Sequence, residues 1–203
     1  MILLIRHGET TGNRKDLILG QKDFPLTEKG IDSTEKLAKL AAVRYNNGII
    51  LASPLGRAQA TAAIFSNSTG WPILTVEGMR ELSCGEWEGK SRKEVAPERQ
   101  FLRTTWDDTP PGGESYTDAE IRVGEVINTI KEIKEYETIA VIGHASVNRV
   151  FLKLWVGLES SRAMTVGQHH ETIYMLGKDG KTSWINIQGE QGVEHFNGNM
   201  LPP

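Results

Sequence analysis

Arginine and histidine residues follow three short apolar runs of this sequence, at points where buried strands would end. Arg6 and His7 follow MILLI, Arg57 comes shortly after IILA, and His144 follows TIAVIG. A guanidinium group binds phosphate through paired donors and keeps its charge. A neutral imidazole nitrogen can attack phosphorus and form a phosphohistidine. These residue types predict a site for a phosphate monoester, in which one histidine is the nucleophile and the arginines neutralise the phosphoryl oxygens.

A nucleophilic histidine has to be neutral and has to carry its proton on the ring nitrogen that does not attack. The charge of Arg6 disfavours a second positive charge on His7. Gly8 allows the backbone to turn closely enough for a carbonyl oxygen to accept the other ring N–H. The departing alkoxide needs a proton from a nearby acid. The spacing of the residues does not choose among four candidates for this acid, Glu77, Glu81, Glu86 and Glu88.

The elements that must position these residues alternate between buried strands and amphipathic helices. Apolar runs at 2–5, 49–52 and 138–142 predict strands that are covered on both faces. The helical stretches between them predict a three-layer α/β/α sandwich with a mostly parallel central sheet. Ligands bind outside the carboxyl ends of the strands in such sheets. If the three strands are neighbours, both histidines and both arginines meet at one edge.

The starts of two helices are predicted from capping residues. Ser53 is expected to cap a helix over 55–65, with Pro54 in its first turn. Arg57 would then be poorly placed for the helix dipole, and a bound phosphate would offset that cost. Ser115 and Asp118 form a predicted capping box for the helix that runs towards residue 136.

Two further elements follow from the apolar pattern. Thr27 begins a predicted helix, and the tail at 172–188 predicts two strands around Asp179 and Gly180. The side chains expected on the inner face of the helix that follows Thr27 are Ile31, Leu37, Leu40, Ala41 and Val43.

The composition predicts one domain over residues 1–203, with an excursion from the sheet at about 77–113 that covers the site. The net charge is −3, so no overall positive field favours nucleic acid or an anionic membrane, and phosphate binding must rely on local cations. The single cysteine, Cys84, is typical of a reducing compartment. We expect a cytoplasmic protein.

A metal site is not predicted. His169 and His170 are neighbours, and adjacent strand residues point to opposite faces, so they cannot easily share one ion. One of the two is instead expected to line the substrate pocket.

Five blocks of the sequence, in order, resemble the histidine phosphatase superfamily, whose fold is phosphoglycerate mutase-like. Together they extend from residue 4 to residue 149. The blocks are LIRHGETTGN at 4–13, PLTEKG at 25–30, ASPLGRAQATA at 52–62, RELSCGEWEG at 80–89 and VIGHASVNR at 141–149.

The resemblance implies a role for each matching residue. His7 would be the phosphorylated nucleophile and Glu81 the proton donor, while no metal or other cofactor is required. The remainder of the phosphate pocket would consist of Arg6, Arg57 and His144, with Asn13, Gly20, Gln21 and Ala145 as further lining residues. Many relatives have glycine where this chain has Ala145, and the methyl group should narrow the pocket slightly.

The leading hypothesis is a phosphomonoesterase that hydrolyses small phosphorylated metabolites through a phosphohistidine. A cofactor-dependent phosphoglycerate mutase is the alternative, and it must keep water away from the intermediate. Mutases of the superfamily carry a longer insertion between the acid and the second histidine, so the compact chain favours hydrolysis. A third hypothesis is an inactive module that binds phosphorylated ligands. The physiological ester and the oligomeric state are left open.

Overall fold

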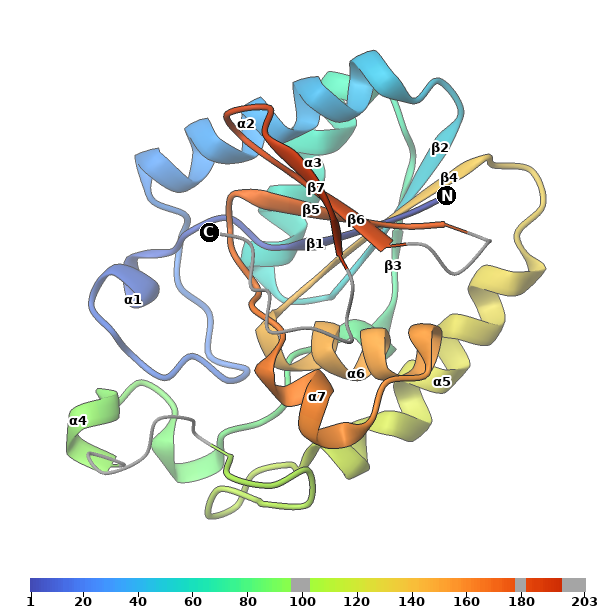
Figure 1. The fold of residues 1–203 in the computed structure, drawn as a ribbon. Helices are drawn as coiled ribbons and strands as arrows, with labels where there is room; N and C mark the ends of the chain where they lie inside the picture. Colours follow the sequence, from blue (N-terminus) through green and yellow to red (C-terminus); the bar gives the residue numbers. More distant parts are fainter. Residues whose placement is uncertain (96–102, 178–181, 195–203) are drawn as a thin grey trace.

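A sheet of seven strands forms the centre of the computed structural model, which describes residues 1–95, 103–177 and 182–194 (Figure 1). The strand order is β3-β2-β4-β1-β5-β6-β7. The strands are β1 (Ile2–Arg6), β2 (Gly48–Ala52), β3 (Ile73–Thr75), β4 (Thr138–Gly143), β5 (Thr172–Leu176), β6 (Thr182–Asn186) and β7 (Gln191–Glu194).

One half of the sheet is parallel and contains the strands that precede the predicted site residues. β4 pairs with β1 on one side and with β2 on the other, both in parallel. In this register Arg6 lies opposite Gly143, and Ala52 lies opposite Ile142. The carboxyl ends of the three strands therefore meet at one edge of the sheet, as expected for neighbouring parallel strands.

The other half of the sheet is an antiparallel ribbon. β5 runs antiparallel to β1, and β6 and β7 continue in the same manner. The expected pair of strands in the tail is present as β5 and β6, whereas the predicted turn at Asp179 and Gly180 lies outside the described residues. The sheet is thus mixed, and its parallel part is the part next to the predicted site.

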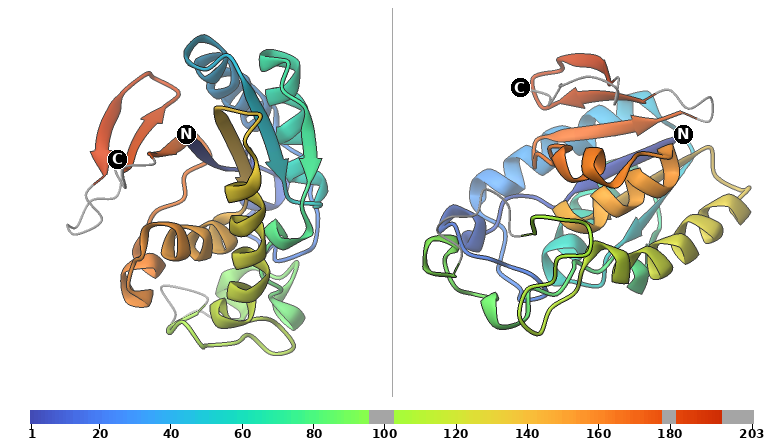
Figure 2. Two further views of the ribbon diagram at one scale, coloured as in Figure 1. Left: turned by 90° about the vertical axis from the view of Figure 1, so that its right-hand side faces the viewer. Right: turned by 60° about the horizontal axis from the view of Figure 1, so that its bottom comes forward.

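Helices cover both faces of the sheet (Figure 2). On β1, Leu3 and Ile5 pack with α2 (Glu28–Arg44) and α3 (Gly56–Thr69). Ile2 and Leu4 pack on the opposite side with α5 (Tyr116–Glu132) and α6 (Ala145–Val156). This alternation follows from the two-residue period of a strand. The α/β fold predicted from the sequence is confirmed. The helices are α1 (Thr11–Arg14), α2 (Glu28–Arg44), α3 (Gly56–Thr69), α4 (Arg92–Val95), α5 (Tyr116–Glu132), α6 (Ala145–Val156) and α7 (Ser160–Thr165).

The predicted inner face of α2 is partly wrong. Leu37 and Ala41 are buried, but Ile31 is 40% exposed and Val43 is 84% exposed. At 100° per residue, Val43 is turned about 200° away from Ala41 and therefore faces solvent. The buried face of α2 is completed by Gly30, Ser33 and Thr34, and these small side chains let the helix approach the loop that follows β1.

The excursion leaves the sheet after β3 and returns at the start of α5. It contains two 3₁₀ turns, Glu77–Met79 and Gly85–Trp87, and the short helix α4. The predicted capping box of Ser115 and Asp118 is present at the start of α5. Residues 96–102 of the excursion lie outside the described part, and the single domain over 1–203 stays a prediction. None of the helices in the described chain is long and apolar enough to cross a bilayer.

Candidate active site

His7 and His144 lie side by side at the carboxyl edge of the parallel strands. His7 directly follows β1, and its backbone N–H donates to the carbonyl oxygen of Gly143 at 3.0 Å. His144 directly follows β4 and is the N-cap of α6. The centroids of the two imidazole rings are 5.0 Å apart. Both side chains are buried, with His7 only 1% exposed.

A carbonyl oxygen of the neighbouring residue determines the tautomer of His7. Nδ1 of His7 lies 2.8 Å from the carbonyl oxygen of Gly8, which can only accept, so Nδ1 carries the proton. Nε2 therefore keeps its lone pair. A Cβ atom on Gly8 would lie 2.6 Å from Oγ1 of Thr34 and 2.8 Å from the carbonyl oxygen of Gly30. Only glycine therefore fits between β1 and α2 at this position. The predicted hydrogen bond between the ring of His7 and a carbonyl oxygen is confirmed.

The surroundings of His7 keep its ring neutral. Burial lowers the pKa of His7 well below its usual value, and the neighbouring His144 and Arg6 lower it further. A third ring lies close by, because Nδ1 of His170 donates to the carbonyl oxygen of His7 at 2.5 Å. Burial lowers the pKa of His170 to about 3, so this ring is neutral as well. His169 is exposed.

His144 is held between Arg57 and Ser53. Nε of Arg57 donates to Nδ1 of His144 at 3.2 Å, and Nε2 of His144 lies 2.7 Å from Oγ of Ser53. Because Nδ1 accepts, Nε2 carries the ring proton and donates it to the serine oxygen. Burial and the charge of Arg57 lower the pKa of His144 well below its usual value. Burial and the charge of Arg57 therefore both keep the ring of His144 neutral.

Arg57 is anchored by the loop that follows α1. Its Nη2 donates to the carbonyl oxygen of Gly20 at 2.6 Å, and its Nη1 donates to that of Lys22 at 2.9 Å. Nη1 also forms an ion pair with Oδ1 of Asp23 at 3.0 Å. Arg57 is 2% exposed, and burial lowers its pKa. The guanidinium group is therefore fixed next to His144 by contacts that come from a distant part of the sequence.

The predicted cap of α3 is wrong. Leu55 is the N-cap, and the hydroxyl oxygen of Ser53 accepts from the N–H of Leu55 while it also binds His144. The carboxylate of Asp23 accepts from the first free N–H groups of α3, those of Gly56 at 2.5 Å and Arg57 at 3.3 Å. The anion at this helix N-terminus is thus a side chain of the protein, and a phosphate is not needed there. No local pattern in the sequence identifies Asp23.

The structure distinguishes the four candidate glutamates. Glu81 is 8% exposed, and its carboxylate lies at the N-terminus of α6. Oε1 accepts from the N–H groups of Val147 and Leu82, each at 3.0 Å, and Oε2 accepts from that of Ser146 at 3.2 Å. Glu77 and Glu86 are exposed, whereas Glu88 accepts from the backbone N–H groups of Gln21 and Cys84.

A cleft of about 370 Å³ opens over this edge of the sheet. Its charged lining is mostly cationic, which suits an anionic ligand. Sequence reasoning named five of its lining residues, Arg6, Asn13, Gly20, Glu81 and Ala145. It missed several others, among them Arg92, Arg103, Tyr116, Arg149 and Met164, which come from the excursion and from the helices that pack against it.

Arg6 and Asn13 each present a donor that the fold does not use. Nη1 of Arg6 donates to the carbonyl oxygen of Gln168 at 2.8 Å, while its buried Nε has no hydrogen-bond partner among the described residues. Burial lowers the pKa of Arg6 to about 10, so the group remains charged at neutral pH. Oδ1 of Asn13 accepts from Thr10, which orients the amide and leaves its NH₂ group as a donor.

Gln21 is placed differently from the other predicted lining residues. Its Nε2 donates to the carbonyl oxygen of Glu81 at 3.1 Å and to Oε2 of Glu114 at 3.2 Å. The side chain of Gln21 therefore binds the loop that carries Glu81 and the carboxylate of Glu114. Across the described ranges, no group of three or more His, Cys, Asp or Glu side chains lies close enough together to hold a metal ion.

Residues 2–188 match the family model of the histidine phosphatase superfamily, branch 1. The chain belongs to this superfamily. The resemblance of the five sequence blocks is thereby confirmed, and so is the prediction that the protein is an enzyme, a histidine phosphatase.

Known proteins similar to this histidine phosphatase include two curated relatives and a solved structure. A probable phosphoglycerate mutase of Yersinia pestis is 33% identical over 165 residues, which are 77% of this chain and 75% of that protein. The adenosylcobalamin/alpha-ribazole phosphatase of Escherichia coli is 29% identical over 161 residues, 76% of this chain and 78% of the relative. The solved structure is that of a mycobacterial glucosyl-3-phosphoglycerate phosphatase complexed with VO3, with a TM-score of 0.77 and 21% sequence identity. The match covers 96% of this chain and 97% of the mycobacterial chain. This last likeness supports the fold.

Proposed function

We propose that this histidine phosphatase hydrolyses small phosphate monoesters, with His7 as the nucleophile and Glu81 as the proton donor. The observation that carries the proposal is the hydrogen bond from Nδ1 of His7 to the carbonyl oxygen of Gly8. It leaves Nε2 unprotonated in a ring that burial keeps neutral. A nucleophile in this state needs no separate base before it attacks.

The first step transfers the phosphoryl group to the protein. The lone pair of Nε2 of His7 forms the N–P bond while the bond between phosphorus and the ester oxygen breaks. Glu81, as the general acid, gives a proton to the departing oxygen, which leaves as an alcohol. Arg6 and Arg57 balance the charge of the phosphoryl oxygens. The ring of His144 lies beside that of His7 and binds Arg57.

The second step returns the phosphoryl group to water. The carboxylate of Glu81 takes a proton from a water molecule, whose oxygen attacks phosphorus as the N–P bond breaks. Inorganic phosphate leaves, and both Glu81 and His7 regain their initial protonation states. The unused donors of Arg6 and Asn13 and the backbone at Gly20 and Ala145 are suited to bind the remaining oxygens of the ester.

The test is a trapped phosphoenzyme. Wild-type protein mixed with a ³²P-labelled monoester and quenched without acid should retain label on His7, because phosphohistidine is labile to acid. The variant His7→Ala should neither retain label nor turn over p-nitrophenyl phosphate. Full activity in this variant would contradict the mechanism. Assays with a panel of small phosphomonoesters, scored by phosphate release, would then identify the substrate.

A phosphoglycerate mutase is the second candidate, since the relative from Yersinia pestis that is 33% identical carries the name probable phosphoglycerate mutase. A mutase would return the phosphoryl group to another hydroxyl of the same substrate. Incubation with 3-phosphoglycerate and a bisphosphate primer separates the two functions. Rapid formation of 2-phosphoglycerate without phosphate release would favour the mutase. We infer a cytoplasmic enzyme whose partner is a small phosphate ester.

A further inference from the structure

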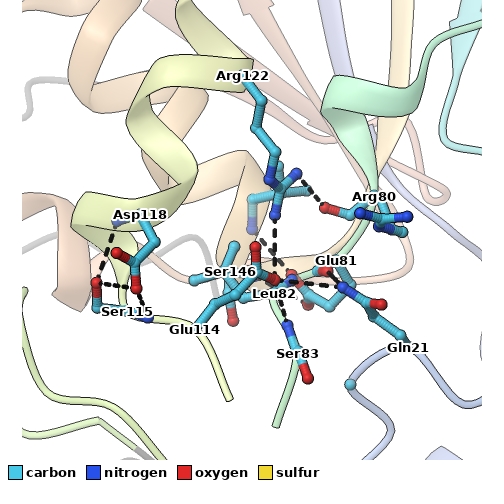
Figure 3. A network of polar contacts seen from close by, with 12 residues as sticks. Gln21, Arg80, Glu81, Leu82, Ser83, Glu114, Ser115, Asp118, Arg122 and Ser146 are labelled. Carbon is cyan, nitrogen blue, oxygen red and sulfur yellow. Dashed lines mark hydrogen bonds and ion pairs between the residues drawn. The ribbon is translucent and has the colours of Figure 1, made fainter. Parts of the chain in front are cut away.

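The loop that carries Glu81 lies outside the sheet, and side chains from other segments hold its backbone (Figure 3). Arg122 of α5 reaches the residues that precede Glu81. Its Nη1 donates to the carbonyl oxygen of Gly78 at 2.8 Å and to that of Arg80 at 2.6 Å. The backbone of α5 also abuts the loop, since a Cβ atom on Gly78 would lie 2.5 Å from the carbonyl oxygen of Arg122.

Glu114 holds the loop on the other side of Glu81. Its Oε2 accepts from the backbone N–H of Ser83 at 2.7 Å and from Nε2 of Gln21 at 3.2 Å. The same nitrogen of Gln21 donates to the carbonyl oxygen of Glu81. The backbone N–H of Glu114 adds a further bond, to the carbonyl oxygen of Ser83 at 2.9 Å. Backbone atoms are therefore fixed on both sides of Glu81 and at Glu81 itself.

The two holding side chains are joined to each other. Nη2 of Arg122 lies 3.6 Å from Oε2 of Glu114, and the side chains are 18% and 27% exposed. Nη2 of Arg122 has no hydrogen bond among the described residues, so this ion pair is its polar contact there. Loss of either charge would remove this link between the segments that hold the loop before and after Glu81.

We propose that Glu114 and Arg122 are positioning residues for Glu81, which keep its carboxyl group at the reacting ester oxygen without touching the substrate. The inference rests on the proposed function, in which Glu81 donates the proton. The carboxylate is fixed on one side by the N–H groups of α6 and on the other by its own loop. Proton transfer requires a heavy-atom distance of about 2.6–3.2 Å, so a small shift of the loop is enough to impair it.

The choice of leaving group separates a positioning role from a merely structural one. An alkoxide is a poor leaving group and needs the proton of Glu81, whereas p-nitrophenolate departs readily without one. The value of kcat/KM reports the steps through cleavage of the ester bond. Its ratio for the two kinds of ester, measured in one preparation, does not depend on the fraction of folded protein.

The experiment compares Arg122→Met and Glu114→Gln with wild type, using glycerol 1-phosphate and p-nitrophenyl phosphate. For each variant we expect kcat/KM to fall about 10- to 100-fold for glycerol 1-phosphate, the size of effect that a misplaced catalytic group produces. The value for p-nitrophenyl phosphate should stay near that of wild type. Arg122→Lys, which keeps the charge, should recover part of the loss.

Glu77→Gln is the matched control. Glu77 belongs to the same loop and pairs with Arg80 at 3.8 Å, but its side chain is 75% exposed. This variant should not change the ratio. An equal loss on both esters in the Glu114 and Arg122 variants, or no loss on either, would overturn the inference. Glu81→Gln shows whether the proposed function itself fails. If Glu81→Gln lacks the leaving-group effect, the acid role of Glu81 is wrong, whereas an effect in Glu81→Gln alone rejects only the positioning role.

Discussion

The strand side and the loop side of the proposed site are built in different ways. His7 and His144 are attached to adjacent strands whose register places them together, and Gly8 and Arg57 complete a buried site around their rings. On the loop side, Glu81 belongs to a segment without strand pairing. Its backbone is held by Arg122, Glu114 and Gln21.

This difference separates two parts of the proposed chemistry. Strand pairing positions Arg6 and the proposed nucleophile His7, which every phosphate ester would need. A network of side chains holds the loop of the proposed acid Glu81, whose proton would matter most when the leaving group is poor. Changes near the strands should therefore affect all esters alike, while changes near the loop should depend on the leaving group.

The largest expected effect is on the strand side. Arg57→Met removes a charge from the proposed phosphate pocket, and we expect kcat/KM to fall roughly 10²–10³-fold, as for loss of a group that stabilises the transition state. The loss should be equal for glycerol 1-phosphate and p-nitrophenyl phosphate. The control Arg44→Met removes an exposed arginine of α2 and should leave both values unchanged. A loss confined to glycerol 1-phosphate would contradict the comparison.

The pH dependence of stability should also come from the strand side. Burial lowers the pKa of His7, His144 and His170 in the folded protein, whereas in the unfolded chain each binds a proton below about pH 6.5. The unfolded state then binds more protons, so the free energy of unfolding falls as pH falls. Three such groups give a loss of up to about 3 kcal/mol between pH 6.5 and 5.5.

Urea unfolding at pH 7.5, 6.5 and 5.5 measures this loss. His170→Gln should reduce the pH-dependent part by about a third, because one of three similar groups is removed. Glu114→Gln, on the loop side, should leave the slope unchanged. A free energy of unfolding that is constant over this range would show that the buried rings take up protons in the folded state.

Two glycines allow the strand side and the loop side to be compared directly. Gly8→Ala places a methyl group against Thr34 and the backbone of Gly30, and Gly78→Ala places one against the backbone of Arg122. Each should lower the free energy of unfolding by about 1–3 kcal/mol, as overpacking does. Gly8→Ala should reduce kcat/KM for both esters, and Gly78→Ala should reduce it mainly for glycerol 1-phosphate.

The control for these glycines is Gly124→Ala in the middle of α5. A Cβ atom there has no neighbour within 4 Å among the described residues, so alanine should raise the free energy of unfolding by about 0.5–1 kcal/mol. If Gly8→Ala or Gly78→Ala were equally stabilising, the close approaches of the backbone would be refuted. Thermal unfolding of the three variants decides this.

The smallest expected effect concerns Asp23. Asp23→Ala removes the carboxylate that binds the first N–H groups of α3 and the guanidinium of Arg57. Loss of a helix cap costs about 1 kcal/mol in the free energy of unfolding. Because Arg57 keeps its bonds to Gly20 and Lys22, kcat/KM should fall only a few-fold, and equally for both esters. A loss as large as that of Arg57→Met would make Asp23 a principal support of the pocket.

Much of the strand side was predictable from the sequence. Apolar runs that end in Arg6-His7 and in Gly143-His144 indicated buried parallel strands with their functional residues at one edge. The hydrogen bond between His7 and Gly8 was predictable because it joins neighbouring residues. The capping box of α5 was predictable because Ser115 and Asp118 satisfy each other within one turn.

Other features depended on packing. Ser53 resembles a helix cap locally, but its hydroxyl binds His144, and Asp23 occupies the start of α3 from 33 positions away along the chain.

By itself, the sequence determined the alternation of strands and helices and the residue types at the strand ends. Both features depend only on residues within a few neighbouring positions. Tertiary structure decided which glutamate lines the cleft and which carboxylate caps α3. It also decided which side chains hold the loop that carries Glu81. Each of those outcomes joins segments that are far apart along the chain, as in the bond between Gln21 and Glu114, 93 positions apart. Such contacts form only when the sheet and helices have packed, so no local pattern of residues can specify them.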